Sequence, residues 1–454
     1  MNFIDKDLRA VQEARVLMEQ AAQAKKKLAL YTQQQLDQAV DEMLQGIAPH
    51  LGTLVEQAVE ETGTGCAEDE RLMAQRLMER IKCTYKEMQC VGMLSAQPEQ
   101  GMVEIGVPMG IIAAVLPAVS PVTAAVSAVL TAVKSGNAIV LTPHPRAVKT
   151  TAKAVAVLQE SARKAGLAEG SIGCMETSAK EGALTLLRHP EVSAVLNMGQ
   201  ESLLNFAEAH AKPVVYGGVA PGPAFIEKTA DVAQAAADVV ASRSFNYGTA
   251  AASEQYLVVD RQIADRAERA LKQCGAYFMN QQEQDKLVHL LGIHGMHCGA
   301  DKAYIGKSAQ WLAVKAGFSV PEGTKVLVSR QDYITDFNPY ASALLCPVLV
   351  MYIEDDWVHA CEKCIELLMG ESHSNTLSIH SSDSEVIGQF AMKKPVGRVL
   401  VNTPMAMGAV GCTTNLFPSL FLGGLTAKQG ITADNISPKT FTYQRKAAFG
   451  VRTF

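Results

Sequence analysis

The strongest constraint on the fold is an uncharged stretch at residues 107–133, which by length alone would qualify as a membrane span. Pro117 and Pro121 would break a continuous helix, and four hydroxyl side chains interrupt the apolar run. We therefore predict a buried βαβ unit, because a parallel strand covered on both faces has a continuous apolar sequence. Its strand, helix and strand are expected at residues 111–116, 123–134 and 138–141.

Strands and helices continue to alternate after this unit, which predicts an α/β fold with two Rossmann-like lobes. The first series is expected at 147–165, 172–176, 180–187, 192–197, 201–211, 213–216 and 230–242. A second series starts near residue 243 and continues with strands at 255–259, 325–328, 348–353, 376–380 and 398–401. Its helices are expected at 263–273, 281–291, 309–317, 357–368 and 384–392. We place the lobes at residues 1–242, with a helical N-terminus, and 243–425.

Composition excludes one class of partner and indicates a compartment. With 41 Lys and Arg against 46 Asp and Glu, the net charge is −5, so a nucleic-acid binder with a broad basic surface is excluded. The ten cysteines are scattered singly, and we find no secretory signal. These features predict a cytoplasmic protein without disulfides and without a membrane partner.

The sequence contains two groups of metal-ligating residue types, and we predict no metal site. Cys361 and Cys364 share a helical pattern, and no second CxxC pair completes a zinc site. The other group, which has only loose metal-ligand spacing in a predicted loop, is His289, His294, His297 and Cys298.

The first helix has two open interpretations. Asp5 is a plausible N-cap, and an apolar face is predicted to contain Leu8, Val11, Met18 and Ala22. This helix either packs on the first lobe or serves as an amphipathic docking helix.

A binding site in such a fold belongs at the carboxyl ends of the strands. The loops that follow strands of the first lobe are 116–121, 142–146 and 198–202, and none carries a GxGxxG fingerprint or a P-loop. His144 lies between two prolines, which is typical of a rigid turn, and a catalytic role stays open. The candidate cofactor-binding residues of these loops are Thr142, Pro143, His144, Gly199 and Gln200.

Seven dispersed segments resemble the CoA-acylating branch of the aldehyde dehydrogenase superfamily, which includes enzymes of bacterial microcompartments. The resemblance covers nearly the whole chain and implies the aldehyde dehydrogenase fold. The segments are Val107-Pro108-Met109-Gly110-Ile111, Gly136-Asn137-Ala138-Ile139, Pro143-His144-Pro145-Arg146-Ala147, Lys212-Pro213, Ala252-Ser253-Glu254-Gln255, Ala316-Gly317-Phe318-Ser319-Val320-Pro321-Glu322 and Val401-Asn402-Thr403-Pro404.

The resemblance implies that a cysteine thiolate attacks an aldehyde, that hydride passes to NAD, and that coenzyme A accepts the acyl group. The cysteine belongs to a Phe-Asp-Asn-Gly-x-x-Cys-Ala-Ser-Glu-Gln segment, which corresponds to residues 245–255. Ala251 occupies the cysteine position. A methyl group forms neither a hemithioacetal nor a thioester, so this covalent route is excluded for the chain as it stands.

Other implied site positions also differ from the family. Ser120 occupies the position of the Asn that stabilises the oxyanion, and Ala343 that of the Glu that holds the nicotinamide ribose. The glycine-rich cofactor loop begins at Gly218 and contains a proline at 221, and the expected Gly-Gly pair is Gly199-Gln200.

These departures predict a catalytically degenerate member of the family, with weak or absent NAD binding and CoA binding left open. An active NAD-dependent CoA-acylating aldehyde dehydrogenase, captured as a Cys-to-Ala variant, is the alternative. As replacement nucleophiles, Ser253 and Thr249 lack a nearby base in the sequence, and Cys346 is the one thiol that stays open.

A degenerate chain would act by association. The resemblance implies an oligomerisation arm at residues 94–105 and a C-terminal oligomerisation segment at 426–454. The resemblance also implies that the lobe at 1–242 corresponds to the cofactor-binding lobe of the family and the lobe at 243–425 to its catalytic lobe. We therefore expect a homo-oligomer, either a dimer or a dimer of dimers. An active paralogue or a microcompartment shell protein is a further expected partner, which would place the chain inside a bacterial microcompartment.

Overall fold

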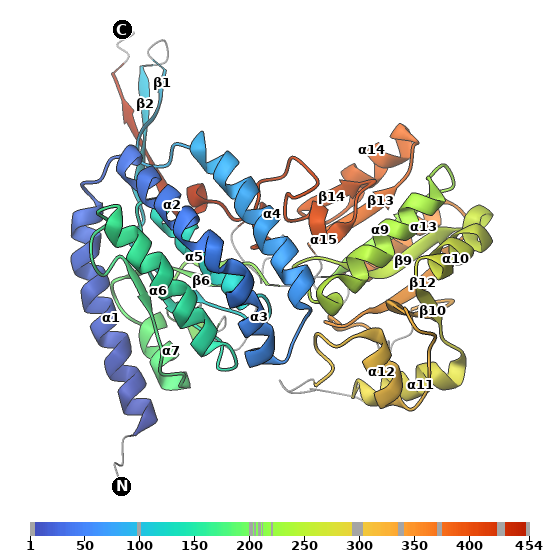
Figure 1. Cartoon of the computed structure of the whole chain (residues 1–454). Coiled ribbons are helices and arrows are strands. Elements are labelled where there is room, and N and C mark those ends of the chain that lie inside the picture. The colour runs from blue at the N-terminus through green and yellow to red at the C-terminus, as the bar shows by residue number, and fades with distance from the viewer. Residues whose placement is uncertain are drawn as a thin grey trace.

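A computed structural model describes residues 5–97, 101–198, 203, 206–207, 210, 212–218, 221–292, 303–334, 340–369, 375–424 and 432–450. Figure 1 shows two α/β lobes and a narrow sheet that projects from the first lobe beside the C-terminus. Within the described residues, the named strands form sheets of five, seven and three strands. The two larger sheets are parallel, which confirms the predicted α/β class.

The first lobe is built on the five-stranded sheet, in the order β5-β4-β3-β6-β7. The chain moves from β3 to one side through β4 and β5, and then returns to the other side with β6 and β7. This reversal creates a topological switch point beside β3, where doubly wound sheets bind ligands. The strands are β3 (Ile111–Val115), β4 (Ala138–Thr142), β5 (Ile172–Cys174), β6 (Val192–Asn197) and β7 (Val214–Tyr216).

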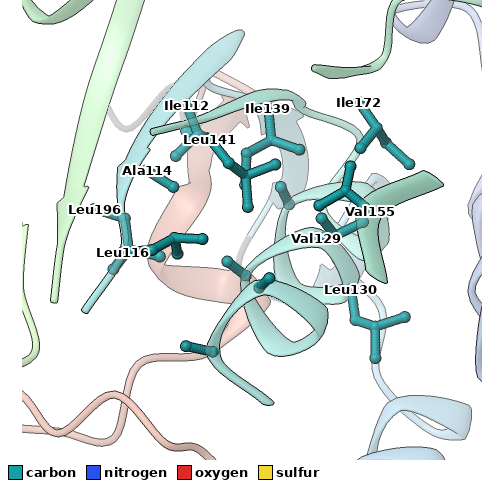
Figure 2. Close-up of a cluster of buried hydrophobic side chains, with 14 of the residues drawn as sticks. Ile112, Ala114, Leu116, Val129, Leu130, Ile139, Leu141, Val155, Ile172 and Leu196 are labelled. Atoms are coloured by element: carbon teal, nitrogen blue, oxygen red, sulfur yellow. The ribbon is translucent and has the colours of Figure 1, made fainter. Parts of the chain in front are cut away.

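The uncharged stretch forms the core of this lobe, as predicted. Every residue of β3, β4 and α5 (Pro121–Lys134) is buried. Figure 2 shows Ile112 and Leu141 from adjacent strands in one buried cluster with Val129 of α5. Each aliphatic side chain buried in this way contributes about 2 kcal/mol to folding. Among the described helices, none is both long enough and apolar enough to cross a bilayer.

Helices cover the sheet of the first lobe, and α1 (Lys6–Leu28) is packed among them. Asp5 caps its first turn by accepting hydrogen bonds from two backbone N–H groups. Ala10, Ala14 and Met18 are fully buried, whereas Leu8, predicted on the apolar face, is 68% exposed in the first turn, three residues after the cap. The other helices are α2 (Gln33–Ile47), α3 (Leu51–Thr62), α6 (Val148–Lys164) and α7 (Lys180–Leu187).

The second lobe is built on the seven-stranded sheet, in the order β10-β11-β12-β9-β8-β13-β14. Its strands are β8 (Gly222–Ile226), β9 (Glu254–Asp260), β10 (Ala276–Phe278), β11 (Val326–Arg330), β12 (Val348–Glu354), β13 (Thr376–His380) and β14 (Arg398–Val401). Its helices are α9 (Val232–Ser244), α10 (Ala264–Gln273), α11 (Gln281–Leu290), α12 (Ala309–Ala316), α13 (Trp357–Leu368), α14 (Ser384–Lys393) and α15 (Met405–Gly408).

The change between the sheets comes earlier than residue 242, the expected boundary. β8 lies between β9 and β13 in the second sheet, so the chain has already left the first sheet after Tyr216. The sequence conceals β8 because Gly222 and Pro223 are typical of a loop. In the structure this strand is fully buried. The helix predicted at 201–211 lies largely outside the described residues.

A three-stranded antiparallel sheet forms an arm. It contains β1 (Gly92–Gln97), β2 (Met102–Pro108) and β15 (Thr442–Ala448), in that order. The two segments that we expected to associate, 94–105 and 426–454, therefore pair with each other, and residues 425–431 and 451–454 are outside the described part. All but the first residue of β15 is exposed.

Helix α4 (Ala67–Lys86) runs between the lobes (Figure 1). Arg80 near its C-terminal end donates hydrogen bonds to the carbonyls of Gly411 and Thr414. Its N-terminal turn reaches the segment that precedes β9, so α4 contributes to the site described next.

Candidate functional site

Residues 245–255, to which the resemblance assigns the nucleophile, are called the nucleophile segment, and this segment begins with a strained turn. Asn246, Tyr247 and Gly248 adopt left-handed backbone conformations, with φ of 48°, 52° and 78°. Two consecutive non-glycine residues in this region cost free energy, and such strain persists only where surrounding contacts enforce it. Asn246 accepts a 2.7 Å hydrogen bond from the Cys66 N–H, and its own N–H donates 2.8 Å to the Asp69 carboxylate. The first turn of α4 therefore holds this turn in place.

Ser120, at the predicted oxyanion position, ends the loop after β3. It precedes α5 with φ of 46°, and its side chain makes no capping hydrogen bond to the helix. The Ser120 N–H donates a 3.2 Å hydrogen bond to Oε1 of Glu70. A carboxylate near the positive N-terminal end of α5 is electrostatically favourable. Because the Ser120 N–H donates to this carboxylate, that N–H is already engaged.

Glu70 connects these two segments, and sequence analysis did not identify it. Oε1 of this buried carboxyl also accepts a 3.1 Å hydrogen bond from Nδ2 of Asn246. Its Oε2 atom has no hydrogen-bond partner among the described residues. Burial raises the pKa of Glu70 to about 7, despite the hydrogen bonds that favour its charged form. Its position inside a helix rich in acidic residues gave no signal that it would be the buried one.

Ala251 lies half-buried in an apolar setting. Ala250 and Ala252 on either side are buried, and all three join a cluster that includes Met405 of α15. The adjacent hydroxyls have structural partners: Thr249 donates to the carbonyl of Asn246. Ser253 accepts from Arg243. Position 251 therefore presents only a methyl group, and the hydroxyls of Thr249 and Ser253 beside it are held in structural hydrogen bonds.

Arg243 ties the nucleophile segment to the segment before β12. Its buried guanidinium donates 2.9 Å to Ser253 Oγ, 2.7 Å to the Leu344 carbonyl and 2.8 Å to the Val348 carbonyl. Burial lowers its pKa to about 10, so it stays charged at neutral pH. This network places half-buried Ala343, the predicted lost ribose position, beside the nucleophile segment. Cys346 is fully buried.

A second buried carboxyl lies three residues after Ala251. Oε1 of Glu254 accepts a 2.9 Å hydrogen bond from the Met405 N–H, while Oε2 has no partner among the described residues. Burial raises its pKa to about 7. The site region thus contains two carboxyls that change protonation near neutral pH.

The predicted cofactor positions occupy the carboxyl edge of the first sheet. Thr142 ends β4, and Pro143 and His144 follow it. Gly218 follows β7, and a Cβ atom there would approach the Tyr216 hydroxyl to 2.5 Å. The two remaining candidates of this sheet edge, Gly199 and Gln200, lie outside the described residues.

His144 has the geometry of a turn residue. Its Nδ1 accepts a 3.2 Å hydrogen bond from the Arg146 N–H two residues later. This contact supports the rigid-turn interpretation that sequence analysis left open. No group of three or more metal-ligating side chains with a suitable arrangement occurs in the described part of the chain. His294, His297 and Cys298 are outside that part.

The fold and the site together define a two-lobed α/β protein whose strained turn and helix α4 meet where the lobes adjoin. Residues 7–286 match the aldehyde dehydrogenase family, and the chain belongs to that family. It is 30% identical over 443 residues to a bifunctional aldehyde-alcohol dehydrogenase of Escherichia coli K12, covering 96% of this chain and 49% of the relative. The chain thus spans about half of the length of such relatives.

A relative of similar length is the succinate-semialdehyde dehydrogenase (acetylating) of Clostridium kluyveri, 29% identical over 410 residues, which cover 90% of this chain and 89% of the relative. The crystal structure of an acetylating aldehyde dehydrogenase from Geobacillus thermoglucosidasius superposes with a TM-score of 0.94 and 35% identity, covering 99% of both chains. A propionaldehyde dehydrogenase of a Clostridium phytofermentans microcompartment shares the fold at a TM-score of 0.85 and 21% identity, over 96% and 97% of the chains. These similarities support the acylating branch of the family.

Proposed function

We propose that this chain is a catalytically degenerate member of the CoA-acylating aldehyde dehydrogenases and acts as a non-catalytic subunit. The observation that carries the proposal is Ala251 at the nucleophile position. The neighbouring hydroxyls of Thr249 and Ser253 are engaged in structural hydrogen bonds, and Cys346 is fully buried. An unactivated hydroxyl is a weak nucleophile, so these groups do not replace a thiolate.

The surroundings of Glu70 support the same conclusion. Oxyanion stabilisation needs free donors aimed at the developing negative charge. Here the Ser120 N–H and the Asn246 amide both donate to the Glu70 carboxyl. When ionised, this carboxylate would repel an oxyanion formed near those groups.

NAD is expected to bind weakly or not at all, because the residue at position 343 does not fit the contact that the family resemblance assigns to it. The methyl group of Ala343 offers no acceptor for ribose hydroxyls. Thr142 and Gly218 lie at the carboxyl edge of the first sheet, where the resemblance places cofactor contacts. CoA binding is left open, because the resemblance assigns Ala343, Thr142 and Gly218 to NAD and assigns none of them to CoA.

Association is the proposed role, through the arm. β15 is an edge strand of the three-stranded sheet, and an exposed edge offers unpaired N–H and C=O groups to another chain. Met93, Tyr443 and Phe449 are among the exposed large apolar side chains of this region. The partner is a second copy of the chain, giving a dimer or dimer of dimers, or an active relative. A shell protein is the further candidate if the chain resides in a microcompartment.

The alternative is an active NAD-dependent CoA-acylating aldehyde dehydrogenase. Its support is the close superposition on an acetylating aldehyde dehydrogenase over nearly the whole chain. The two functions differ in whether any thiol of this chain can react productively with an aldehyde.

The deciding experiment measures NADH formation from acetaldehyde or propanal with CoA at high NAD. The purified chain and its Ala251→Cys variant are assayed side by side. Silence in both supports the non-catalytic role. Activity restored by Ala251→Cys alone would show that the rest of the site is intact, and turnover by the unaltered chain would reject the proposal.

A further inference from the structure

A buried lysine contacts a buried cysteine in the second lobe, away from the nucleophile segment. Lys394 caps the C-terminus of α14, and its Nζ lies 2.7 Å from Sγ of Cys361 in α13. The same Nζ donates a 2.7 Å hydrogen bond to the Cys361 carbonyl. Lys394 is 8% exposed and Cys361 is 5% exposed, so the pair lies just below the surface.

The separation of these two atoms is unusually small for a nitrogen and a sulfur. It equals an ordinary N–H···O distance, although sulfur is a larger atom than oxygen. A small movement would therefore bring Nζ to bonding distance from Sγ. The second hydrogen bond, to the carbonyl, fixes the direction of the approach.

Within the described part of the chain, no carboxylate forms an ion pair with the lysine of this contact. None of the ion pairs among the described residues includes Lys394, and its Nζ lies 4.2 Å from the centroid of the Phe390 ring. A cation next to sulfur stabilises the negative charge that develops when a thiol reacts with an oxidant.

We propose that Cys361 is a site of reversible oxidation by hydroperoxides and that Lys394 traps the oxidised sulfur as a covalent cross-link. In the first step Sγ attacks a peroxide oxygen; the S–O bond forms and the O–O bond breaks. The other peroxide oxygen leaves with the thiol proton, as water from hydrogen peroxide or as an alcohol from an organic hydroperoxide. Sulfur loses two electrons to the peroxide, and the product is a sulfenic acid.

The second step is a condensation. The ammonium of Lys394 first releases one proton to the solvent. Its amine nitrogen then attacks Sγ; the S–N bond forms, the S–O bond breaks, and the hydroxide leaves as water with a second proton from nitrogen. The product is a sulfenamide, analogous to the one that a sulfenic acid forms with a backbone nitrogen. No further oxidant is consumed.

Cys364 is the other possible trap, and the helix disfavours it. Residues three apart in a helix have Cβ atoms about 5–6 Å apart, whereas a disulfide needs about 3.5–4.5 Å. Burial also raises the pKa of the Cys364 thiol to about 12, so it remains protonated at neutral pH. Both cysteines belong to the core of the second lobe, where α13 cannot bend freely.

The test exposes the full-length chain to hydrogen peroxide and follows intact mass and peptide maps. We expect a species lighter by about 2 Da, in which the peptides with Cys361 and Lys394 are joined. The cross-link should persist in Cys364→Ser, disappear in Cys361→Ser, and reverse with dithiothreitol. Cys83→Ser is the matched control, because Cys83 is an exposed thiol. It should leave the cross-link unchanged.

Lys394→Arg keeps the charge but should give only a sulfenic acid at Cys361, which dimedone labels. Mapping of the unaltered chain needs no variant and decides the matter even if this variant folds poorly. A disulfide between Cys361 and Cys364 would overturn the proposal. A cross-link heavier by about 14 Da, with oxygen retained between sulfur and nitrogen, would overturn the condensation step. Absence of reaction at Cys361 while Cys83 is oxidised would overturn it entirely.

Discussion

The side-chain amide of Asn246 donates a 3.1 Å hydrogen bond to Oε1 of Glu70, which joins a strained turn of the second lobe to helix α4. The same oxygen accepts the Ser120 N–H from the first lobe. One carboxyl group thus holds two segments that the family resemblance assigns to catalysis. Because that carboxyl is buried, its protonation state couples this junction to pH.

Glu70→Gln should flatten the pH dependence of stability. The pKa of Glu70 is about 7 in the folded state against an ordinary 4.5, so the folded chain binds more protons between these values. Its contribution to stability is therefore present below about pH 4.5 and is lost as the pH rises to about 7. The neutral glutamine avoids that loss, which is on the order of 3 kcal/mol.

The measurement is denaturant unfolding at pH 5 and pH 8. Glu254, whose pKa is raised in the same direction, keeps part of the slope in both proteins. Exposed Glu68 in the same turn supplies the control, Glu68→Gln, which should leave the profile unchanged. Parallel pH profiles for the unaltered chain and Glu70→Gln would show that Glu70 is not the responsible group.

Ala251→Cys alone should give little or no turnover, whereas a triple variant that adds Ser120→Asn and Ala343→Glu should give more. Each restored interaction acts on a different requirement: nucleophile, oxyanion donor and ribose acceptor. Loss of one oxyanion donor typically costs about 10²–10³ in kcat. Steady-state NADH formation from acetaldehyde with CoA compares the two variants. Equal activity of the single and triple variants would mean that positions 120 and 343 do not limit this site.

Gly248→Ala should destabilise the chain more than Gly323→Ala. Both glycines have φ near 80°, so each substitution introduces about 1 kcal/mol of backbone strain. A Cβ atom at Gly248 would also lie 2.5 Å from the backbone carbon of Cys346, whereas Gly323 has nothing within 4 Å. Thermal unfolding should show a lower Tm for Gly248→Ala. A matched loss in both variants would mean that the backbone near Cys346 yields easily.

Charges on the arm should dissociate the proposed oligomer. The double variant Tyr443→Asp, Phe449→Asp replaces two apolar side chains of the arm region, which are 53% and 67% exposed, with carboxylates. Light scattering after size exclusion should show a shift from dimer or tetramer toward monomer. The control is Met392→Asp in α14, which is 87% exposed outside the arm. An unchanged mass for the arm variant would place the interface elsewhere.

Local sequence patterns determined the class of fold and most elements of both lobes. The uncharged stretch predicted β3, α5 and β4 within two residues, because burial on both faces leaves a continuous apolar run. Periodicity likewise predicted α13 and β13 with their observed limits. The methyl group at position 251 also needs no structure, since no fold gives an alanine side chain a nucleophile.

Tertiary structure decided what depends on contacts between distant segments. β8 carries loop-forming residues, and only its pairing with β9 and β13 reveals a buried central strand. Glu70 lies 50 residues before Ser120 and 176 before Asn246, so no local pattern distinguishes it from the acidic residues beside it. The contact between Lys394 and Cys361 likewise spans 33 residues. Burial, hydrogen bonding and proximity arise when the chain folds, and those quantities set the chemistry of each side chain.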